Sequence, residues 1–183
     1  MIRLSQPEDM TALLEVAGAI GFQPSELESL REMMVDSIGC GEEGDRFWLT
    51  DEDEIDGILG VAYCEPERMT DRTWNLQLIA IRPEFQRKGR GAALLQQVEQ
   101  TLRGRGGRML LVETAGPVRN LPPILNPNRR GGRMLLVETA GVPEFDRARQ
   151  FYAKCGYEKE ARIRDFYAAG EDKVVFRKVL TVD

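Results

Sequence analysis

The sequence contains no histidine, and this absence narrows the chemistry that the protein can perform. Ser-His-Asp and Cys-His catalysis are excluded, and so is any zinc site that needs an imidazole ligand. The cysteines number only three and are widely spaced, which suits reduced thiols better than a disulfide framework and rules out a four-thiolate site. We therefore expect no metal, and any proton transfer must use Tyr, Glu, Asp, Cys, Lys, the backbone or water.

Long apolar runs and an excess of positive charge are also missing. No segment approaches the ~20 apolar residues that a membrane span requires, and the first residues lack the pattern of a signal peptide. The net charge of −5 argues against a general nucleic-acid binder. We therefore expect a cytoplasmic protein without membrane contact, folded as a single domain over its 183 residues, of which 42 % are apolar.

Hydrophobic periodicity predicts a mixed α/β order of elements. The expected strands are 2–4, 46–50, 58–64, 74–81, 108–114, 158–163 and 174–180. The expected helices are 9–20, 24–39, 89–102 and 144–154. The early strands should form antiparallel hairpins, followed by a strand–helix–strand crossover. The acidic run Asp51–Glu54 reads as a solvated hairpin turn.

One segment is duplicated. Residues 105–116 recur letter for letter as residues 130–141, and the linker between the copies is rich in proline and asparagine, a loop composition. Two copies are too few for a solenoid, and the residues that follow them differ. We expect an insertion within about residues 104–141, with two equally qualified candidates for one strand.

The segment Leu78–Leu95 predicts a phosphate-binding turn. A strand leads through Arg82-Pro83 into a loop with Gly89 and Gly91, and a helix follows. The free N–H groups at a helix N-terminus favour an anion such as a pyrophosphate, and Arg87, Lys88 and Arg90 add positive charge. A third glycine for a Rossmann fingerprint and the Gly-Lys-Ser/Thr of a P-loop are absent. An ordinary tight turn before a helix is the alternative interpretation.

These residues resemble the coenzyme A signature of the GNAT (GCN5-related N-acetyltransferase) superfamily, Gln/Arg-x-x-Gly-x-Gly/Ala, which appears here as Gln86-x-x-Gly89-x-Gly91. The strand before the turn resembles the core strand of that family. Residues 148–157 are similar to its late Ala-x-x-Phe-Tyr helix. The resemblance implies a mostly antiparallel central sheet, flanked by helices, with a splayed strand pair that admits acetyl-CoA.

The resemblance also implies roles for individual residues. Main-chain groups of the core strand would hold the pantetheine arm, and the turn would hold the pyrophosphate. The cofactor-binding residues would be Ile79, Ala80, Ile81, Gln86, Arg87, Lys88, Gly89, Arg90, Gly91 and Ala92. Tyr152 matches the general acid that protonates the departing thiolate, with simple packing as the alternative. The backbone N–H of Ile81 is our candidate for the oxyanion donor.

The general base is harder to assign. Related sequences often carry a glutamate on the core strand where this chain has Asn75, which cannot accept the proton. The remaining candidate is Glu138, or its twin Glu113 in the first copy. We expect the second copy, residues 133–139, to fill the strand because it runs directly into the Tyr152 helix. The displaced copy would then be free to pair with another chain, with a homodimer as one outcome.

The expected function is transfer of an acetyl group from acetyl-CoA to a primary amine of a small molecule or peptide, by direct attack in a ternary complex. The alternative is a catalytically silent CoA-binding or regulatory module, which the missing strand glutamate and the insertion make plausible. A different phosphate-ligand protein that uses the same turn is a third option.

Overall fold

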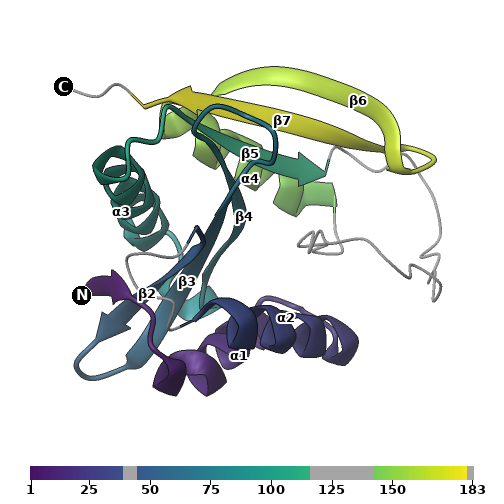
Figure 1. Ribbon diagram of the computed structural model, residues 1–183. Helices are drawn as coiled ribbons and strands as arrows, with labels where there is room; N and C mark the ends of the chain where they lie inside the picture. The colour runs from purple at the N-terminus through teal and green to yellow at the C-terminus, as the bar shows by residue number, and fades with distance from the viewer. Residues whose placement is uncertain (39–44, 116–141, 181–183) are drawn as a thin grey trace.

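A computed structural model describes residues 1–38, 45–115 and 142–180, and these ranges build one seven-stranded sheet (Figure 1). The strands are β1 (Ile2–Leu4), β2 (Phe47–Asp53), β3 (Gly57–Pro66), β4 (Thr73–Ile81), β5 (Met109–Ala115), β6 (Glu158–Ala168) and β7 (Glu171–Val179). The helices are α1 (Met10–Ala19), α2 (Pro24–Ser37), α3 (Arg90–Gly104) and α4 (Val142–Lys154), with 3-10 turns η1 (Pro7–Asp9) and η3 (Pro83–Phe85). The expected mixed α/β order is confirmed.

The spatial order of the strands is β1-β2-β3-β4-β5-β7-β6. Among the described strands, β4 and β5 are the one parallel pair, and α3 connects them as the expected crossover. The strands β6 and β7 extend towards each other beyond their expected ends, to Ala168 and from Glu171. Charged residues interrupt the apolar pattern at these ends, Arg164 and Asp165 on β6 and residues 171–173 on β7, and ladder hydrogen bonds do not require apolar side chains. A hydrophobic pattern therefore did not indicate the full length of either strand.

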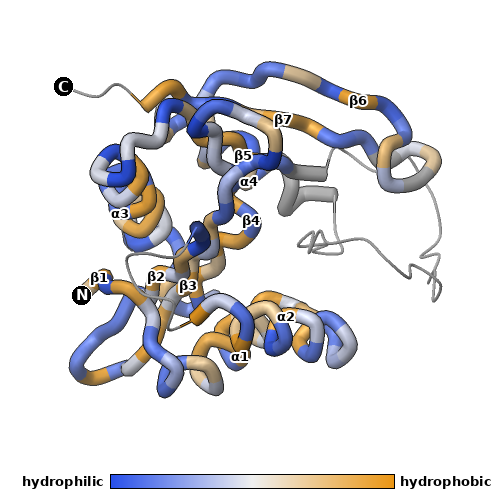
Figure 2. The backbone as a smooth tube through the Cα atoms, viewed as in Figure 1, coloured by the Kyte–Doolittle hydropathy of each residue, from blue (hydrophilic) through white to orange (hydrophobic). Residues whose placement is uncertain are grey.

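Two apolar clusters lie on opposite faces of the sheet. The helices α1 and α2 cover one face, where Val61 and Tyr63 of β3 are buried. The other face holds α3 and α4 over Ala62 and Cys64. The alternation along β3 follows the two-residue period of a strand. Figure 2 shows the same segregation, with apolar positions of α3 turned towards the sheet.

The sheet opens between β4 and β5. The two strands pair over only four positions, from Thr73 opposite Met109 to Leu76 opposite Val112. Beyond this point β5 continues with β7, while β4 continues with β3 as far as Ile81. One edge of β4 from Gln77 onward is therefore unpaired by β5. This is the splayed pair that the sequence resemblance implied, and Figure 1 shows β4 leaving the upper part of the sheet.

The first repeat copy, not the second, forms β5. Met109–Ala115 lies between β4 and β7, and the backbone N–H of Arg108 donates to Arg72 O at 2.9 Å. The expectation that residues 133–139 would fill the strand was therefore wrong; those residues lie outside the described ranges. The identical residues and equal loop length gave the sequence no preference. The first copy follows α3 through a short connection, the usual length between a helix and the next strand.

Candidate active site

The glycine-rich turn lies directly after β4 and ends in α3. Gly89 is the N-cap of α3 with φ of 81°, and no side chain caps this helix. A left-handed φ is open to glycine at little cost, so the turn itself requires Gly89. The first backbone N–H to bond within the helix is that of Ala93, to Gly89 O at 3.0 Å. The amides of residues 90–92 precede it and face outward as potential anion donors.

The three basic residues of the turn have different surroundings. Arg87 and Lys88 are exposed, and neither forms a salt bridge among the described residues. Arg90 instead binds two carboxylates of β2, Asp51 at 3.0 and 3.2 Å and Asp53 at 2.8 Å. The Arg90 side chain is therefore committed to the hairpin, and its contribution to anion binding would come from its backbone N–H.

This arrangement corrects the interpretation of the acidic run. Asp51 is buried at 3 % exposure rather than solvated, and β2 extends through Asp53. Together with Arg90, Asp51 fixes the start of α3 against β2. No local pattern could have indicated this pair, because 39 residues separate its members.

The open edge of β4 presents main-chain groups of Ile79 and Ile81. The Arg82 N–H donates to Leu59 O at 2.8 Å, so it points towards β3. The backbone N–H and C=O groups of successive β4 residues therefore point alternately to β3 and to the open side. The alternation directs the backbone of Ile79 and Ile81 outward and that of Ala80 to β3. Gln86 uses its side-chain N–H to bind Ile81 O at 2.9 Å, which ties the turn to the end of the strand.

Gly91 packs against α4 and the end of β4. A Cβ at Gly91 would meet the Phe151 ring at 3.6 Å and Ile81 at 3.8 Å, which are ordinary contacts. The fold therefore tolerates a larger residue here, in contrast to Gly89. The turn thus carries uncapped amides at residues 90–92 and two exposed cations, Arg87 and Lys88. This set suits a pyrophosphate, and the free β4 edge beside it suits an extended arm.

Tyr152 lies in an aromatic cluster between α4 and the sheet. Its ring centroid is 5.2 Å from that of Phe151, 5.8 Å from Tyr157 and 5.9 Å from Phe176. Burial raises the pKa of Tyr152 well above its usual value, with a smaller effect from the nearby Cys155 and Cys64 thiols. The phenol therefore keeps its proton at neutral pH, the state that a general acid requires.

The candidate carboxylates fall at different places. Glu138 lies outside the described residues. Its twin Glu113 lies on β5, where Lys173 Nζ of β7 is 2.5 Å from its Oε2. The Lys173 ammonium also lies 4.7 Å above the Phe166 ring. Asn75 is buried on β4, and its Nδ2 is 3.4 Å from Glu67 Oε2. No local pattern indicated Lys173 or Glu67, because the contacts of both depend on strand register.

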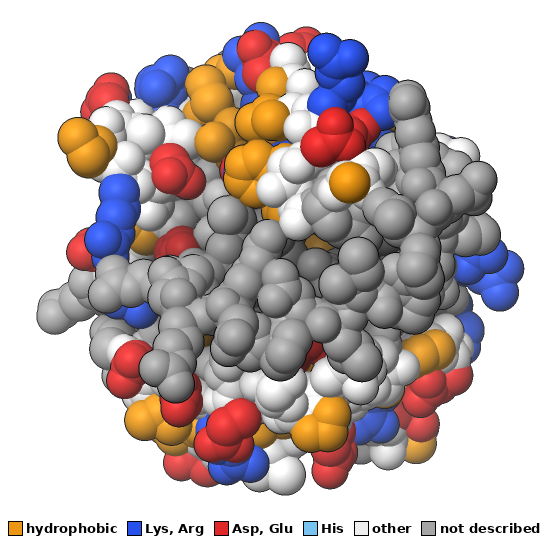
Figure 3. Space-filling model, turned by 90° about the vertical axis from the view of Figure 1, so that its right-hand side faces the viewer, with side chains coloured by type: hydrophobic (Ala, Val, Ile, Leu, Met, Phe, Trp, Pro, Cys, Tyr) orange, Lys and Arg blue, Asp and Glu red, His pale blue; other side chains and the backbone are white. Residues whose placement is uncertain are grey.

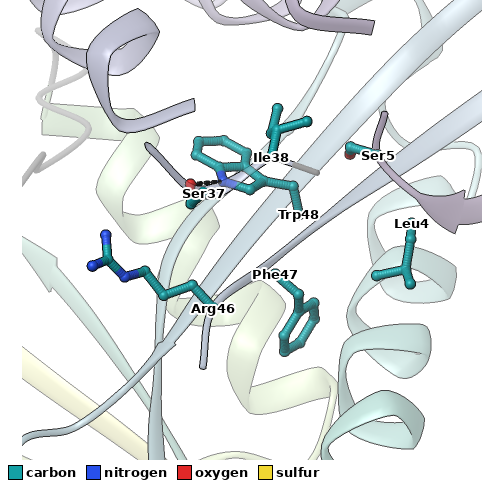
Figure 4. A pocket seen from close by; sticks show the side chains of 7 residues that line it. All are labelled: Leu4, Ser5, Ser37, Ile38, Arg46, Phe47 and Trp48. Atoms are coloured by element: carbon teal, nitrogen blue, oxygen red, sulfur yellow. Dashed lines mark hydrogen bonds between the residues drawn. The ribbon is translucent and has the colours of Figure 1, made fainter. Parts of the chain in front are cut away.

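A small cavity lies away from this site. It measures about 20 Å³, room for roughly one water molecule, and is lined by residues around the start of β2 (Figure 4). Trp48 Nε1 donates to Ser37 Oγ at 2.7 Å beside it. The described residues contain no cluster of three potential metal ligands, and none of the helices within those ranges is long and apolar enough to cross a membrane.

Fold and site together define a CoA-dependent acyltransferase, and comparison with known proteins names the family. The sequence profile "Acetyltransferase (GNAT) domain" matches residues 43–159, more than half of the chain. The chain belongs to the GNAT family and is an N-acetyltransferase whose cofactor is acetyl-CoA. A search of curated proteins gave no significant match.

Solved structures agree with this assignment. A crystal structure assigned to the GNAT family from Desulfovibrio desulfuricans is 27 % identical, with TM-score 0.77 and 99 % of both chains covered. Two others share the fold at lower identity. An aminoglycoside 6'-N-acetyltransferase complexed with coenzyme A has 16 % identity and TM-score 0.72, covering 99 % of this chain and 97 % of its own. The ribosomal-protein-S18-alanine N-acetyltransferase of Escherichia coli has 18 % identity and TM-score 0.63, covering 100 % and 95 %.

Proposed function

We propose that the protein acetylates a primary amine by direct attack within a ternary complex. The observation that carries this proposal is the open edge of β4 beside the uncapped start of α3, with Tyr152 on the same face of the sheet. When bound, acetyl-CoA supplies an activated acetyl group as a thioester. The amides of residues 90–92, with Lys88 and Arg87, would hold its pyrophosphate, and Ile79 would pair with the pantetheine arm as an added strand.

The backbone N–H of Ile81 would stay free at the open edge, because Gln86 binds only its carbonyl. We assign it to the pantetheine arm. The oxyanion role expected from the sequence does not suit Ile81, because the arm leads from the turn at Ile81 away along β4. Tyr152 would donate its phenolic proton to the departing sulfur. A thiol has a pKa of about 8–9, so a phenol that is protonated at neutral pH can supply that proton.

A cationic acceptor suits the surface beside the open edge. In Figure 3, acidic side chains lie along the lower half of the face, at the height of α1 and α2, with basic side chains between some of them. On β3, Glu65 lies on the α1–α2 side of the sheet, two residues after the buried Tyr63 of that side. Two neighbours are named for an aminoglycoside and for an alanine of a ribosomal protein, both amines. An amine that is protonated in solution is therefore the acceptor class we favour, and a small molecule or a peptide could supply it.

The alternative is a catalytically silent CoA-binding module. Asn75 favours it, because a buried amide replaces the strand carboxylate that related sequences carry. The homodimer and the cytoplasmic location expected from the sequence stay predictions.

A two-stage experiment separates these functions. Thermal unfolding with acetyl-CoA, CoA, ATP and NAD should show stabilisation by the two CoA compounds alone. Thiol release from acetyl-CoA, measured with an amine panel, should then be acceptor-dependent. Stabilisation without acceptor-dependent release would support the silent module, and no stabilisation would contradict both.

A further inference from the structure

The apex of the β4–β5 opening marks the place where the amine must react. The phosphate-binding turn follows Ile81 at one end of the free edge, and β5 closes the opening at Leu76. An arm that starts at the turn and follows this edge therefore ends beside Gln77. Gln77 is also an extra residue in the ladder, since Leu76 opposes Cys64 and Leu78 opposes Tyr63. Such a bulge turns a side chain in a new direction.

Gln77 directs its side chain to Glu65 of β3. Its Nε2 donates to Glu65 Oε1 at 3.0 Å, while the Tyr63 hydroxyl donates to Glu65 Oε2 at 3.0 Å. Both oxygens are thus oriented by neutral donors. Tyr63 is buried and stacks on Trp48 with ring centroids 4.2 Å apart, so the carboxylate rests on a rigid support.

The hydrogen bonds to the Glu65 carboxylate come from neutral groups. Within ranges 1–38, 45–115 and 142–180, no Lys or Arg forms a salt bridge with it. The charged and titratable groups nearby are Tyr63, Glu67 and Arg46, the last near the Tyr63 hydroxyl. Glu113, by contrast, is engaged by Lys173. Glu67 lies further from the apex, with its N–H bonded to Thr73 O at the start of β4.

We propose that Glu65 accepts the proton of the acceptor ammonium, directly or through one water, and so replaces the carboxylate missing at Asn75. This inference rests on the proposed acetyl transfer. The nitrogen gives one proton to Glu65, and its lone pair forms the N–C bond as the C–S bond breaks. Tyr152 supplies a proton to the sulfur. The second nitrogen proton passes to water, from which Tyr152 is reprotonated, and Glu65 releases its proton to solvent.

The test compares Glu65→Gln with the matched control Glu67→Gln, using spermidine, kanamycin and an Ala-initiated peptide as acceptors. Glu65→Gln should lower kcat/KM by about 100-fold or more, while the Kd for CoA stays within twofold of wild type. Glu67→Gln should change kcat/KM less than fivefold. The pH dependence of kcat/KM separates a catalytic role from a structural one. In the wild type, kcat/KM should be independent of pH just below the pKa of the acceptor amine. In Glu65→Gln, kcat/KM should rise tenfold per pH unit over the same range, because only the unprotonated amine reacts.

Two further variants cover a failure of Glu65→Gln to fold. Gln77→Leu keeps the carboxylate but removes one donor, so the plateau should remain with a smaller loss of rate. Asn75→Glu, added to Glu65→Gln, should restore part of the rate by placing a carboxylate on β4. If the wild type turns over and Glu65→Gln has the same activity and the same pH profile, the role of Glu65 is overturned and the proposed acetyl transfer stands. Absence of wild-type turnover with every amine would overturn the proposed acetyl transfer as well.

Discussion

Gly91 of α3 and Phe151 of α4 approach so that a Cβ at Gly91 would lie 3.6 Å from the aromatic ring. That distance is an ordinary contact, so the protein itself does not require glycine there. We expect Gly91→Ala to keep or slightly raise the free energy of unfolding, since alanine favours a helix by about 1 kcal/mol over glycine. The Kd for CoA should stay within about twofold of wild type, because the added methyl group would lie against Phe151 and Ile81 and the CoA signature admits alanine at this position.

Gly89→Ala provides the contrasting control, measured by the same denaturant titration and CoA calorimetry. Its φ of 81° should cost the variant about 1–2 kcal/mol of stability. A loss of CoA affinity of about tenfold in Gly91→Ala would contradict the expectation that the added methyl group lies against Phe151 and Ile81.

Two tyrosines of one aromatic cluster, Tyr152 and Tyr157, allow a matched test of Tyr152 as the general acid. Tyr152→Phe should lower turnover about 100-fold or more, in the range of general acid catalysis, and leave CoA binding intact. Tyr157 donates its hydroxyl to Glu99 Oε1 at 3.1 Å, a structural bond that joins α3 to the segment between α4 and β6. Tyr157→Phe should therefore lower the Tm with turnover per folded molecule nearly unchanged. Stopped-flow thiol release and calorimetry measure the two effects, and full turnover in Tyr152→Phe would remove Tyr152 from the mechanism.

Two cations of the turn should have separable effects. Lys88 lies exposed, 4.9 Å above the Phe85 ring, with no carboxylate partner among the described residues. Lys88→Ala should weaken CoA binding about fivefold, equivalent to about 1 kcal/mol, and reduce the salt dependence of binding. Arg90→Ala should instead lower the free energy of unfolding by about 1–3 kcal/mol, because it leaves Asp51 buried without its donor. The reverse pattern, measured by calorimetry and urea titration, would contradict the division of roles.

The duplication allows an unusually clean deletion. Removal of residues 117–141 yields the same sequence as removal of residues 105–129, because the copies are identical. We expect the shortened chain to fold, since either deletion leaves one complete strand sequence ahead of α4. It should bind CoA with a Kd within about threefold of the full chain, a change under about 1 kcal/mol. Circular dichroism and CoA titration check this; loss of folding would show that both copies are required.

Acid should destabilise the protein through Asp9. Burial tends to raise the pKa of Asp9, but hydrogen bonds from Arg3, at 2.7 and 2.9 Å, and from the Gln6 N–H outweigh it, so the pKa is lowered. A lowered pKa in the folded state contributes stability above the unfolded value, about 4, and that stability is lost as the pH falls below it. Between about pH 4 and 2, the urea midpoint of Asp9→Asn should change less with pH than that of the wild type. The variant Glu8→Gln, at an exposed position, should keep the wild-type dependence.

The sequence by itself determined the elements whose signals are local. Periodicity located α3 and β4, and the glycine spacing located the turn between them, because these features depend on neighbours within a few residues. The Tyr152 helix was found in the same way.

Only the tertiary structure decided the contacts that cross between strands. Strand register brought Gln77 to Glu65 and Lys173 to Glu113. The packing of α3 against β2 also buried Asp51 beside Arg90, although an acidic run of this kind is typical of a solvated turn. The choice of repeat copy belongs to the same class, since identical residues carry identical propensities. A register is set by the packing of a whole sheet, and no local pattern encodes it.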